Sequence, residues 1–279
     1  DGRLGFVHRR LSILDLSELG WQPMASSDKR YYLIYNGEVY NYIELRQELE
    51  RLGHSFISRS DTEVMLAALQ QWGVDEACKR FEGMFAFALL DTTASMLTLA
   101  RDPFGIKPLY YADREGEFAF ASEIKALLTL GLPRQANPAA MLAYLIDGVC
   151  DHGEETIFRG VRQLPAGGIL EVDVAGPPRI VARRVYWSVQ LGKTLDVSPA
   201  EASRLVHDAF FANIARHLRS DVPVGAALSG GIDSSSIVTS IRRVAPSDLE
   251  LHAFSYLADD PRLNEEQWMR AAASASRAT

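Results

Sequence analysis

The stretch Val222–Ser235 places the strongest constraint on how this chain can fold. The apolar run Val222–Leu228 is followed by Ser229-Gly-Gly-Ile-Asp-Ser234 and then by an apolar-periodic segment, which predicts a buried strand, a tight loop and a helix. Two adjacent glycines let the backbone turn tightly and approach a ligand, and the first N–H groups of a helix attract an anion. The stretch predicts either a phosphate-binding loop or a plain strand-to-helix turn in which Asp233 caps the helix.

The sequence around this loop favours a parallel sheet. The common Gly-x-x-x-x-Gly-Lys cradle is excluded, because no lysine lies between Gly225 and Ser240. A helix is expected over Ala202–Leu218 and a second strand over Leu251–Tyr256, so that helices and strands alternate. Ligands of such sheets bind at the carboxyl ends of the strands, which is where the Ser229 loop lies.

Composition narrows the classes of function. The 279 residues are 47% hydrophobic and carry a net charge of −7 without a basic block, so we expect buried cores and no nucleic-acid partner. No apolar run reaches the roughly 20 residues of a membrane-spanning helix, which predicts a soluble, cytoplasmic protein with no membrane partner. Cys78 and Cys150 are too few and too far apart for a disulfide framework, so buried thiols are expected. Small-molecule chemistry is favoured.

The first part of the chain mixes short strands with helices. Strands are expected at Tyr31–Tyr35, Gly83–Leu90 and Met96–Ala100, helices at Tyr42–Leu52 and Thr62–Trp72, and a hairpin at Ile157–Leu170. Gly53 and Gly73 are expected to end the two helices. We place one domain at 1–190, a linker at 191–200 and a second domain at 201–279.

Polar clusters interrupt these patterns, and each has two interpretations. Arg9 and Arg10 are either solvated surface charges or a carboxylate clamp. Asn36-Gly37 is either a hairpin turn or a pair of donors for an oxyanion. Either Asp61 or Thr62 would serve as the N-cap of the following helix. Alternatively, Asp61 would bind a substrate ammonium group.

A fourth cluster, Asp147–Glu155, contains Cys150 and His152 among several acidic residues. Its spacing matches no zinc or calcium pattern. We therefore interpret it as a polar loop and assign no metal ligand in the chain.

Seven ordered motifs resemble one family, the glutamine-dependent asparagine synthetases. The motifs are His8-Arg-Arg-Leu-Ser-Ile-Leu-Asp15, Tyr35-Asn-Gly-Glu-Val-Tyr-Asn41, Ser60-Asp-Thr-Glu63, Phe81-Glu-Gly-Met-Phe-Ala-Phe-Ala88, Arg101-Asp-Pro-Phe-Gly-Ile-Lys-Pro-Leu-Tyr110, Ala121-Ser-Glu-Ile-Lys-Ala126 and Leu228-Ser-Gly-Gly-Ile-Asp-Ser-Ser235. They cover nearly the whole chain. The resemblance implies an α+β N-terminal-nucleophile amidotransferase sandwich with α-β-β-α layers, followed by an α/β parallel-sheet ATP pyrophosphatase domain.

The resemblance also implies roles for individual residues. In the first domain, Arg10 would bind the glutamine α-carboxylate, Asp61 the α-ammonium group, and Asn36 and Gly37 would form the oxyanion hole. The remaining residues of that pocket would be Leu11, Ser12, Ile13, Leu14 and Glu38. In the second domain, the pyrophosphate part of ATP would contact Ser229, Gly230, Gly231, Asp233 and Ser234, with Leu228 and Tyr256 near the adenosine.

The implied reaction is ATP-dependent amidation of L-aspartate to L-asparagine. Ammonia would come from glutamine through a cysteine thioester, while magnesium-bound ATP would adenylate aspartate with loss of pyrophosphate. ATP and Mg²⁺ are the implied cofactors, and glutamine and aspartate are the implied partners. The oligomeric state is left open, with a homodimer as the candidate.

One departure limits the resemblance, because the family's nucleophile is an N-terminal cysteine. We expect that residue to precede Asp1, the synthetase domain to continue beyond Thr279, and these 279 residues alone to turn over neither glutamine nor ATP. Alternatives are a related amide-forming or lactam-forming ligase with another acid acceptor, and a non-catalytic scaffold that retains the fold. A glutaminase fused to a sugar-phosphate or phosphoribosyl domain would lack the Ser229 loop.

Overall fold

The computed structural model describes residues 4–114, 116–149, 153–192, 194–246, 249–260, 262 and 264–279. It divides into two compact units, Asp1–Leu191 and Gly192–Thr279. Among the described residues, no helix is both long and apolar enough to cross a membrane.

Within its described residues, the first unit is built on two antiparallel sheets. The strands are β1 (Met24–Ala25), β2 (Tyr31–Val39), β3 (Gly83–Asp91), β4 (Met96–Arg101), β5 (Tyr110–Arg114), β6 (Glu117–Ala121), β7 (Arg162–Gln163), β8 (Gly168–Asp173) and β9 (Arg179–Val185). The larger sheet has the strand order β1-β2-β3-β4-β8-β9, and the smaller has the order β6-β5-β7.

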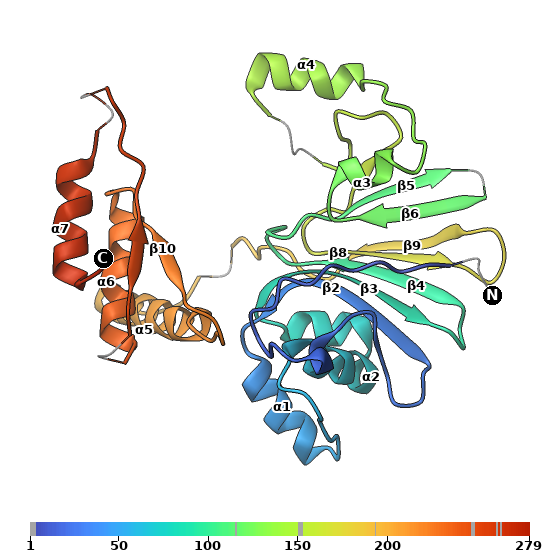
Figure 1. Ribbon diagram of the computed structural model, residues 1–279, viewed down its shortest axis with the longest axis horizontal. Helices are drawn as coiled ribbons and strands as arrows, with labels where there is room; N and C mark the ends of the chain where they lie inside the picture. Colours follow the sequence, from blue (N-terminus) through green and yellow to red (C-terminus); the bar gives the residue numbers. More distant parts are fainter. Residues whose placement is uncertain are drawn as a thin grey trace. The chain divides into compact units, whose positions relative to one another are not determined.

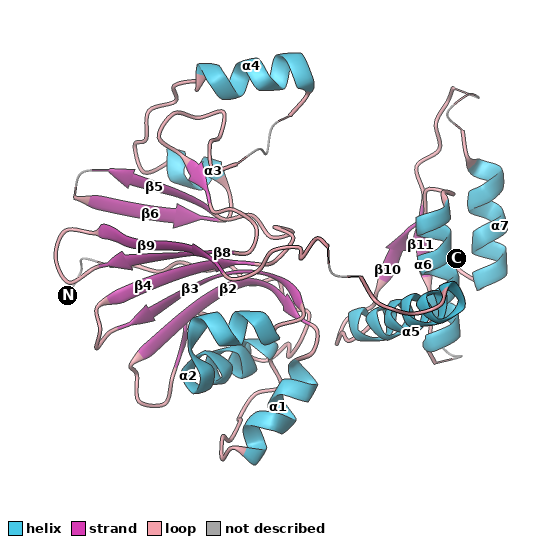
Figure 2. Cartoon of the chain, turned by 180° about the vertical axis from the view of Figure 1, so that it is seen from behind, coloured by secondary structure: helices cyan, strands magenta, loops and turns pink. Residues whose placement is uncertain are grey.

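Helices cover the outer faces of these two sheets. The helices α1 (Tyr42–Arg51) and α2 (Asp61–Arg80) pack on the larger sheet, while α3 (Ile124–Leu128) packs on the smaller one, as Figure 1 and Figure 2 show. A fourth helix, α4 (Pro138–Asp147), follows α3 in the chain.

The alternation of side chains along the strands explains why the sheets stack. In β3, Phe85, Phe87 and Leu89 point into the core under α1 and α2, whereas Ala86 and Ala88 point into the core between the sheets. The small alanines let the second sheet approach, and larger residues such as Tyr111 fill that layer. A third core joins the smaller sheet to α3. The predicted α-β-β-α sandwich is therefore confirmed.

One expectation about local structure in this unit is confirmed and another is wrong. Gly73 ends the first helical segment of α2, because its backbone is not helical (φ 74°, ψ 169°), and a second helical segment follows it and buries Ala77 and Cys78. The segment Ile157–Leu170 is not a hairpin, because β7 pairs with β5 and β8 pairs with β4 and β9. Its central turn carries the chain from one sheet to the other, and an alternating pattern cannot say which sheet a strand joins.

The second unit contains a parallel strand pair with helices around it. Its elements are α5 (Pro199–His217), β10 (Gly225–Ala227), α6 (Ile232–Val244), β11 (His252–Phe254) and α7 (Glu266–Ser276). β10 and β11 pair in parallel, with Gly225 opposite His252, which confirms the predicted pairing although both strands are shorter than expected. Its core contains Leu228, Val238 and Met269.

Candidate functional site

The candidate site in the first unit lies along the outer edge of β2. β1 pairs with β2 only as far as Leu33, so the outer edge of β2 is open beyond that residue. Side chains replace the missing strand: Tyr35 N donates to Gln22 Oε1 (2.6 Å), and His8 Nε2 donates to the carbonyl of Tyr35 (2.9 Å). Farther along, Val39 N donates to Asp61 Oδ2 (3.0 Å).

The N–H of Gly37 points toward this same outer edge. Backbone groups alternate between the two sides of a strand, and Gly37 has the parity of Tyr35 and Val39. Glycine is required here, because a Cβ on Gly37 would collide with the carbonyl of Met84 on β3. The hairpin-turn interpretation of Asn36-Gly37 is therefore wrong, since both residues lie inside a continuous strand.

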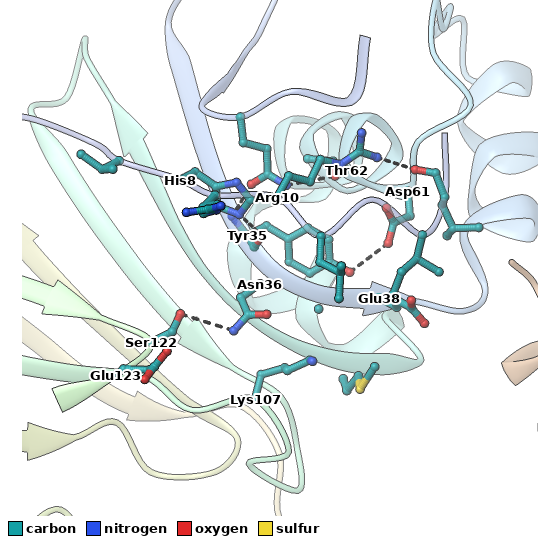
Figure 3. Close-up of a pocket in the computed structure, with 18 residues that line it drawn as sticks. His8, Arg10, Tyr35, Asn36, Glu38, Asp61, Thr62, Lys107, Ser122 and Glu123 are labelled. Carbon is teal, nitrogen blue, oxygen red and sulfur yellow. Dashed lines mark hydrogen bonds between the residues drawn. The ribbon is translucent and has the colours of Figure 1, made fainter. Parts of the chain in front are cut away.

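A cavity of about 340 Å³ opens against this edge (Figure 3). Its walls come from the loop before β1, the β2 edge, the start of α2, the loop after β4 and the residues after β6. The lining residues are Val7, His8, Arg9, Arg10, Leu11, Ile13, Leu14, Gln22, Tyr35, Asn36, Gly37, Glu38, Asp61, Thr62, Met84, Lys107, Ser122 and Glu123.

Asp61 is a buried carboxylate at the first residue of α2. The N-cap is Ser60, whose hydroxyl accepts from Thr62 N, so the expectation that Asp61 or Thr62 caps the helix is wrong. Burial raises the pKa of Asp61, whereas hydrogen bonds from the Val39 N–H and the Tyr35 hydroxyl (2.9 Å) lower it by stabilising the ionised form. Asp61 is only 5% exposed, and the helix N-terminus also favours its negative charge.

Arg10 supplies the positive charge on the same side of the cavity. Its guanidinium donates to the carbonyl oxygens of Leu14 and Ser17, and it lies near enough to Asp61 to lower the pKa of that carboxyl group. Gly20 packs directly against the guanidinium, and a Cβ at this position would displace the guanidinium. The loop around Arg10 is therefore folded about its guanidinium.

Asp15 connects this loop to the start of α2 through hydrogen bonds. Its carboxylate accepts from Arg59 N (2.7 Å), just before the helix, and from the N–H and hydroxyl of Ser17. Hydrogen bonds to Ser17 and Arg59 hold the pKa of Asp15 below its usual range, although burial opposes them. Arg10 and Asp61 are thus held on one wall by a carboxylate that lines no part of the cavity itself.

Asn36 and Glu38 lie on the face of β2 that points toward the smaller sheet. Asn36 Nδ2 donates to Ser122 Oγ (3.3 Å), directly after β6. Burial and the charge of Asp61 raise the pKa of Glu38, and the ammonium group of Lys107 opposes that shift. Figure 3 shows the Lys107 side chain pointing into the cavity.

A buried carboxylate builds the loop that carries Lys107. Asp102, which is fully buried, accepts from four backbone N–H groups, those of Phe85, Phe104, Ile106 and Lys107. Arg101 closes the loop by donating to the carbonyl oxygens of Lys107 (2.7 Å) and Gly105 (2.8 Å).

The structure brings together most of the predicted glutamine-binding residues. Arg10, Leu11, Ile13, Leu14, Asn36, Gly37, Glu38 and Asp61 all line the cavity, whereas Ser12 is not among its lining residues. His8, Gln22 and Lys107 also line the cavity, although they were not predicted as site residues from the sequence. Lys107 and His8 do lie within the motifs quoted above, but Gln22 belongs to none of them.

The predicted nucleotide loop lies at the start of α6 in the second unit. Gly231, not Asp233, is the N-cap of this helix, and no side chain caps the first turn. Ser229 N donates to Ser234 Oγ (3.2 Å), and Gly231 N donates to Ser229 Oγ (3.3 Å), so the two hydroxyls shape the loop. Gly230 has a φ of +91°, a conformation that side chains disfavour.

Two residues expected near the adenosine differ in their surroundings. Leu228 is 1% exposed, and its side chain packs in the core of the second unit. Tyr256 is 82% exposed, beyond the end of β11. The backbone of Leu228 is also paired, because its N–H donates to the Phe254 carbonyl and its carbonyl accepts from the Ser255 hydroxyl, whereas the ring of Tyr256 is accessible.

The other sequence candidates acquire no role in the described part of the chain. Cys78 is buried in α2, and burial raises the pKa of its thiol far above the usual range, as expected of a structural cysteine. Residues 150–152 of the Asp147–Glu155 cluster lie outside the described residues. The described residues contain no group of three or more His, Cys, Asp or Glu side chains that could hold a metal ion.

Known families match both units. The family described as "Glutamine amidotransferase domain" matches residues 1–187, and the family described as "Asparagine synthase" matches residues 205–278. The amidotransferase of the solved structure "Glutamine phosphoribosylpyrophosphate (PRPP) amidotransferase from B. subtilis" is 17% identical, with a TM-score of 0.44 over 83% of this chain and 48% of that one. That likeness is too low to support a conclusion.

Curated relatives match most of this chain. Asparagine synthetase [glutamine-hydrolyzing] 1 of Bacillus subtilis is 38% identical over 88% of this chain, and a putative asparagine synthetase of Mycobacterium tuberculosis is 39% identical over 85% of it. The chain spans 38% and 37% of the lengths of these two relatives. The match over residues 1–187 shows that the chain belongs to the glutamine amidotransferase domain family, and its second unit is similar to the asparagine synthase family.

Proposed function

We propose that this chain is the glutaminase part, with a piece of the synthetase part, of an enzyme that makes asparagine from aspartate with ammonia from glutamine. The observation that carries the proposal is the single cavity in which buried Asp61, Arg10 and the donors of the β2 edge converge. An amino acid with an amide side chain carries an ammonium group, a carboxylate and a carbonyl oxygen, and the cavity offers a partner of the right kind for each.

The two ends of glutamine would contact different walls of the cavity. The α-carboxylate would bind the Arg10 guanidinium and the α-ammonium group would bind Asp61, because opposite charges attract strongly where water is excluded. The side-chain carbonyl would then face the Gly37 N–H and the Asn36 amide, whose donors would stabilise the negative oxygen of a tetrahedral intermediate. No described residue is assigned as the nucleophile.

The loop of the second unit suits the pyrophosphate part of ATP. Its uncapped helix N-terminus presents backbone N–H groups, and the hydroxyls of Ser229 and Ser234 add further donors. Bound Mg²⁺ would neutralise part of the phosphate charge, although no ligand for it is assigned in this chain. We further propose a cytoplasmic enzyme, as expected of small-molecule biosynthesis, and leave a homodimer open.

The test is a product analysis on the natural protein that carries this sequence. It would receive glutamine labelled with ¹⁵N in the amide, together with aspartate, ATP and Mg²⁺. We expect ¹⁵N-labelled asparagine, glutamate, AMP and pyrophosphate, identified by mass spectrometry. Glutamate without any amidated product would leave the glutaminase standing and overturn the assignment of aspartate, whereas no glutamate would overturn both.

A second candidate function differs in the acid that accepts ammonia. A relative named Amidase chyE from Penicillium rubens is 33% identical over 84% of this chain, so this arrangement of units also occurs in a protein that carries another name. The same labelled glutamine, supplied with a panel of carboxylic acids, distinguishes the two candidates. Incorporation of ¹⁵N into an acid other than aspartate would favour the second.

A further inference from the structure

We propose that Gln22 is a positioning residue for glutamine hydrolysis, because it ends the pairing of β1 with β2 and so leaves the Gly37 N–H facing the cavity. The inference rests on the proposed glutaminase function and adds to it a residue that contacts the backbone of β2. Gln22 is half-buried and lines the cavity.

The strand register shows where the pairing stops. Met24 lies opposite Leu33, and continuing the antiparallel register by two residues places Gln22 opposite Tyr35. A continued strand would accept the Tyr35 N–H with its backbone. Instead the Gln22 side chain accepts it, with its Oε1 at 2.6 Å. The side chain thus occupies the last pairing position before Gly37.

The next pair in this register would place Gly20 opposite Gly37. The chain does not continue there as a strand, because residues 18–20 form a short 3₁₀ helix and Gly20 packs against the Arg10 guanidinium. The space opposite Gly37 is therefore part of the cavity instead of a partner strand. An oxyanion donor requires this arrangement, since a strand N–H already paired with a neighbour cannot bind a substrate.

Two further contacts keep this edge in place. His8 Nε2 donates to the Tyr35 carbonyl, so both backbone groups of Tyr35 are held by side chains. The other end of Gln22 reaches α2, where its Nε2 donates to Thr62 Oγ1 (3.4 Å), next to Asp61. Gln22 therefore connects the oxyanion edge to the helix that carries the ammonium-binding carboxylate.

This placement predicts an effect on kcat with little change in KM. The Gly37 N–H would interact most strongly with the oxyanion, which exists only along the reaction path, so a small displacement costs transition-state stabilisation. Arg10 and Asp61 would still bind the two ends of glutamine. Gln22→Met keeps a similar length and removes both hydrogen bonds, whereas Gln22→Glu keeps an acceptor for Tyr35 N.

The experiment measures glutaminase kinetics of the natural protein and its variants, with thermal unfolding of each. We expect Gln22→Met to lower kcat at least about tenfold, with KM for glutamine within about threefold of the parent. Gln22→Glu is expected to retain most of kcat, its added charge changing mainly KM. Gln70→Met, at an exposed position of α2, is the matched control and should behave as the parent.

Several outcomes would overturn the inference. A Gln22→Met enzyme with the parent's kcat, or one in which only KM rises, would show that Gln22 does not position the donor. Should Gln22→Met not fold, Gln22→Glu decides, because a tenfold fall in its kcat contradicts the role of the acceptor. A parent without glutaminase activity would overturn the proposed function and this inference together, whereas an active parent with an unaffected variant removes the inference alone.

Discussion

The two candidate sites of this chain are built in opposite ways. The proposed nucleotide loop of the second unit is local, because the residues from Ser229 to Ser234 shape one another through hydrogen bonds within six positions of the sequence. The cavity of the first unit draws its walls from residues 7–14, from β2, and from positions as distant as Ser122 and Glu123. A loop of consecutive residues can be recognised in the sequence, whereas a cavity assembled from distant segments depends on how the sheets stack.

The two sites also treat charge differently. In the first unit, carboxylates are buried and satisfied by backbone donors, as Asp61, Asp102 and Asp15 are. In the nucleotide loop, hydroxyls and the uncapped start of α6 provide donors without a buried charge. Substitutions of the buried carboxylates in the first unit should therefore have large effects on binding or stability, and those of the hydroxyls in the second should have smaller effects on binding alone.

The largest expected effect is that of Asp61→Asn on glutamine binding. Removing the charge leaves the α-ammonium group without its partner and costs about 3 kcal/mol, which corresponds to roughly a hundredfold in affinity. Calorimetric titration with L-glutamine measures this loss, and Asp113→Asn, at an exposed position in β5, serves as the control. Unchanged glutamine affinity in Asp61→Asn would remove Asp61 from the site.

Asp102→Asn is the next in size, and it should reduce stability. The amide loses the charge that four backbone N–H groups bind, and we expect the first unit to lose about 2 to 4 kcal/mol of its free energy of unfolding. Urea unfolding followed by the near-ultraviolet signal measures this change. If the stability of the variant equals that of Asp113→Asn, the Lys107 loop does not depend on this carboxylate.

Ser234→Ala tests the local site. The substitution removes a hydroxyl that accepts from Ser229 N and donates within the loop, and we expect ATP affinity to fall about tenfold, with glutamine affinity unchanged. Titrations with Mg·ATP and with glutamine separate the two effects. Ser274→Ala, on the exposed side of α7, is the control. A loss of glutamine affinity in Ser234→Ala would contradict the independence of the two sites.

The smallest expected effect is a shift of pH dependence in Lys107→Met. The ammonium group of Lys107 lowers the pKa of Glu38, which burial has raised, so removing it raises that pKa further. The Glu38 carboxylate then requires a higher pH to ionise. On the proposal that glutamine binds to the form of the cavity in which Glu38 is ionised, we expect the acid limb of the kcat/KM profile for glutamine to move upward by up to about one pH unit. Lys79→Met, an exposed substitution on α2, should leave the profile in place, and a downward shift would contradict the assignment.

The fold was largely predictable from periodicity, and the exceptions have physical causes. Short runs rich in β-forming residues and bounded by turn residues predict β2, β3 and β4. Such runs do not identify the partner of a strand, and the hairpin expected across β7 and β8 does not form. Gly73 ends the first helical segment of α2 as expected, and a second segment, which packs Ala77 and Cys78 into the core, follows it.

For the candidate site, the sequence by itself determined the chemistry of the residues that a resemblance could align, such as Arg10, Asn36 and Asp61. Those motifs are contiguous, so their spacing survives in the sequence. Only the tertiary structure decided that Gln22 ends a strand pairing and that Lys107 enters the cavity from another loop. The physical reason is that backbone hydrogen bonding and the stacking of sheets join positions far apart in the chain, and no local pattern records which positions those are.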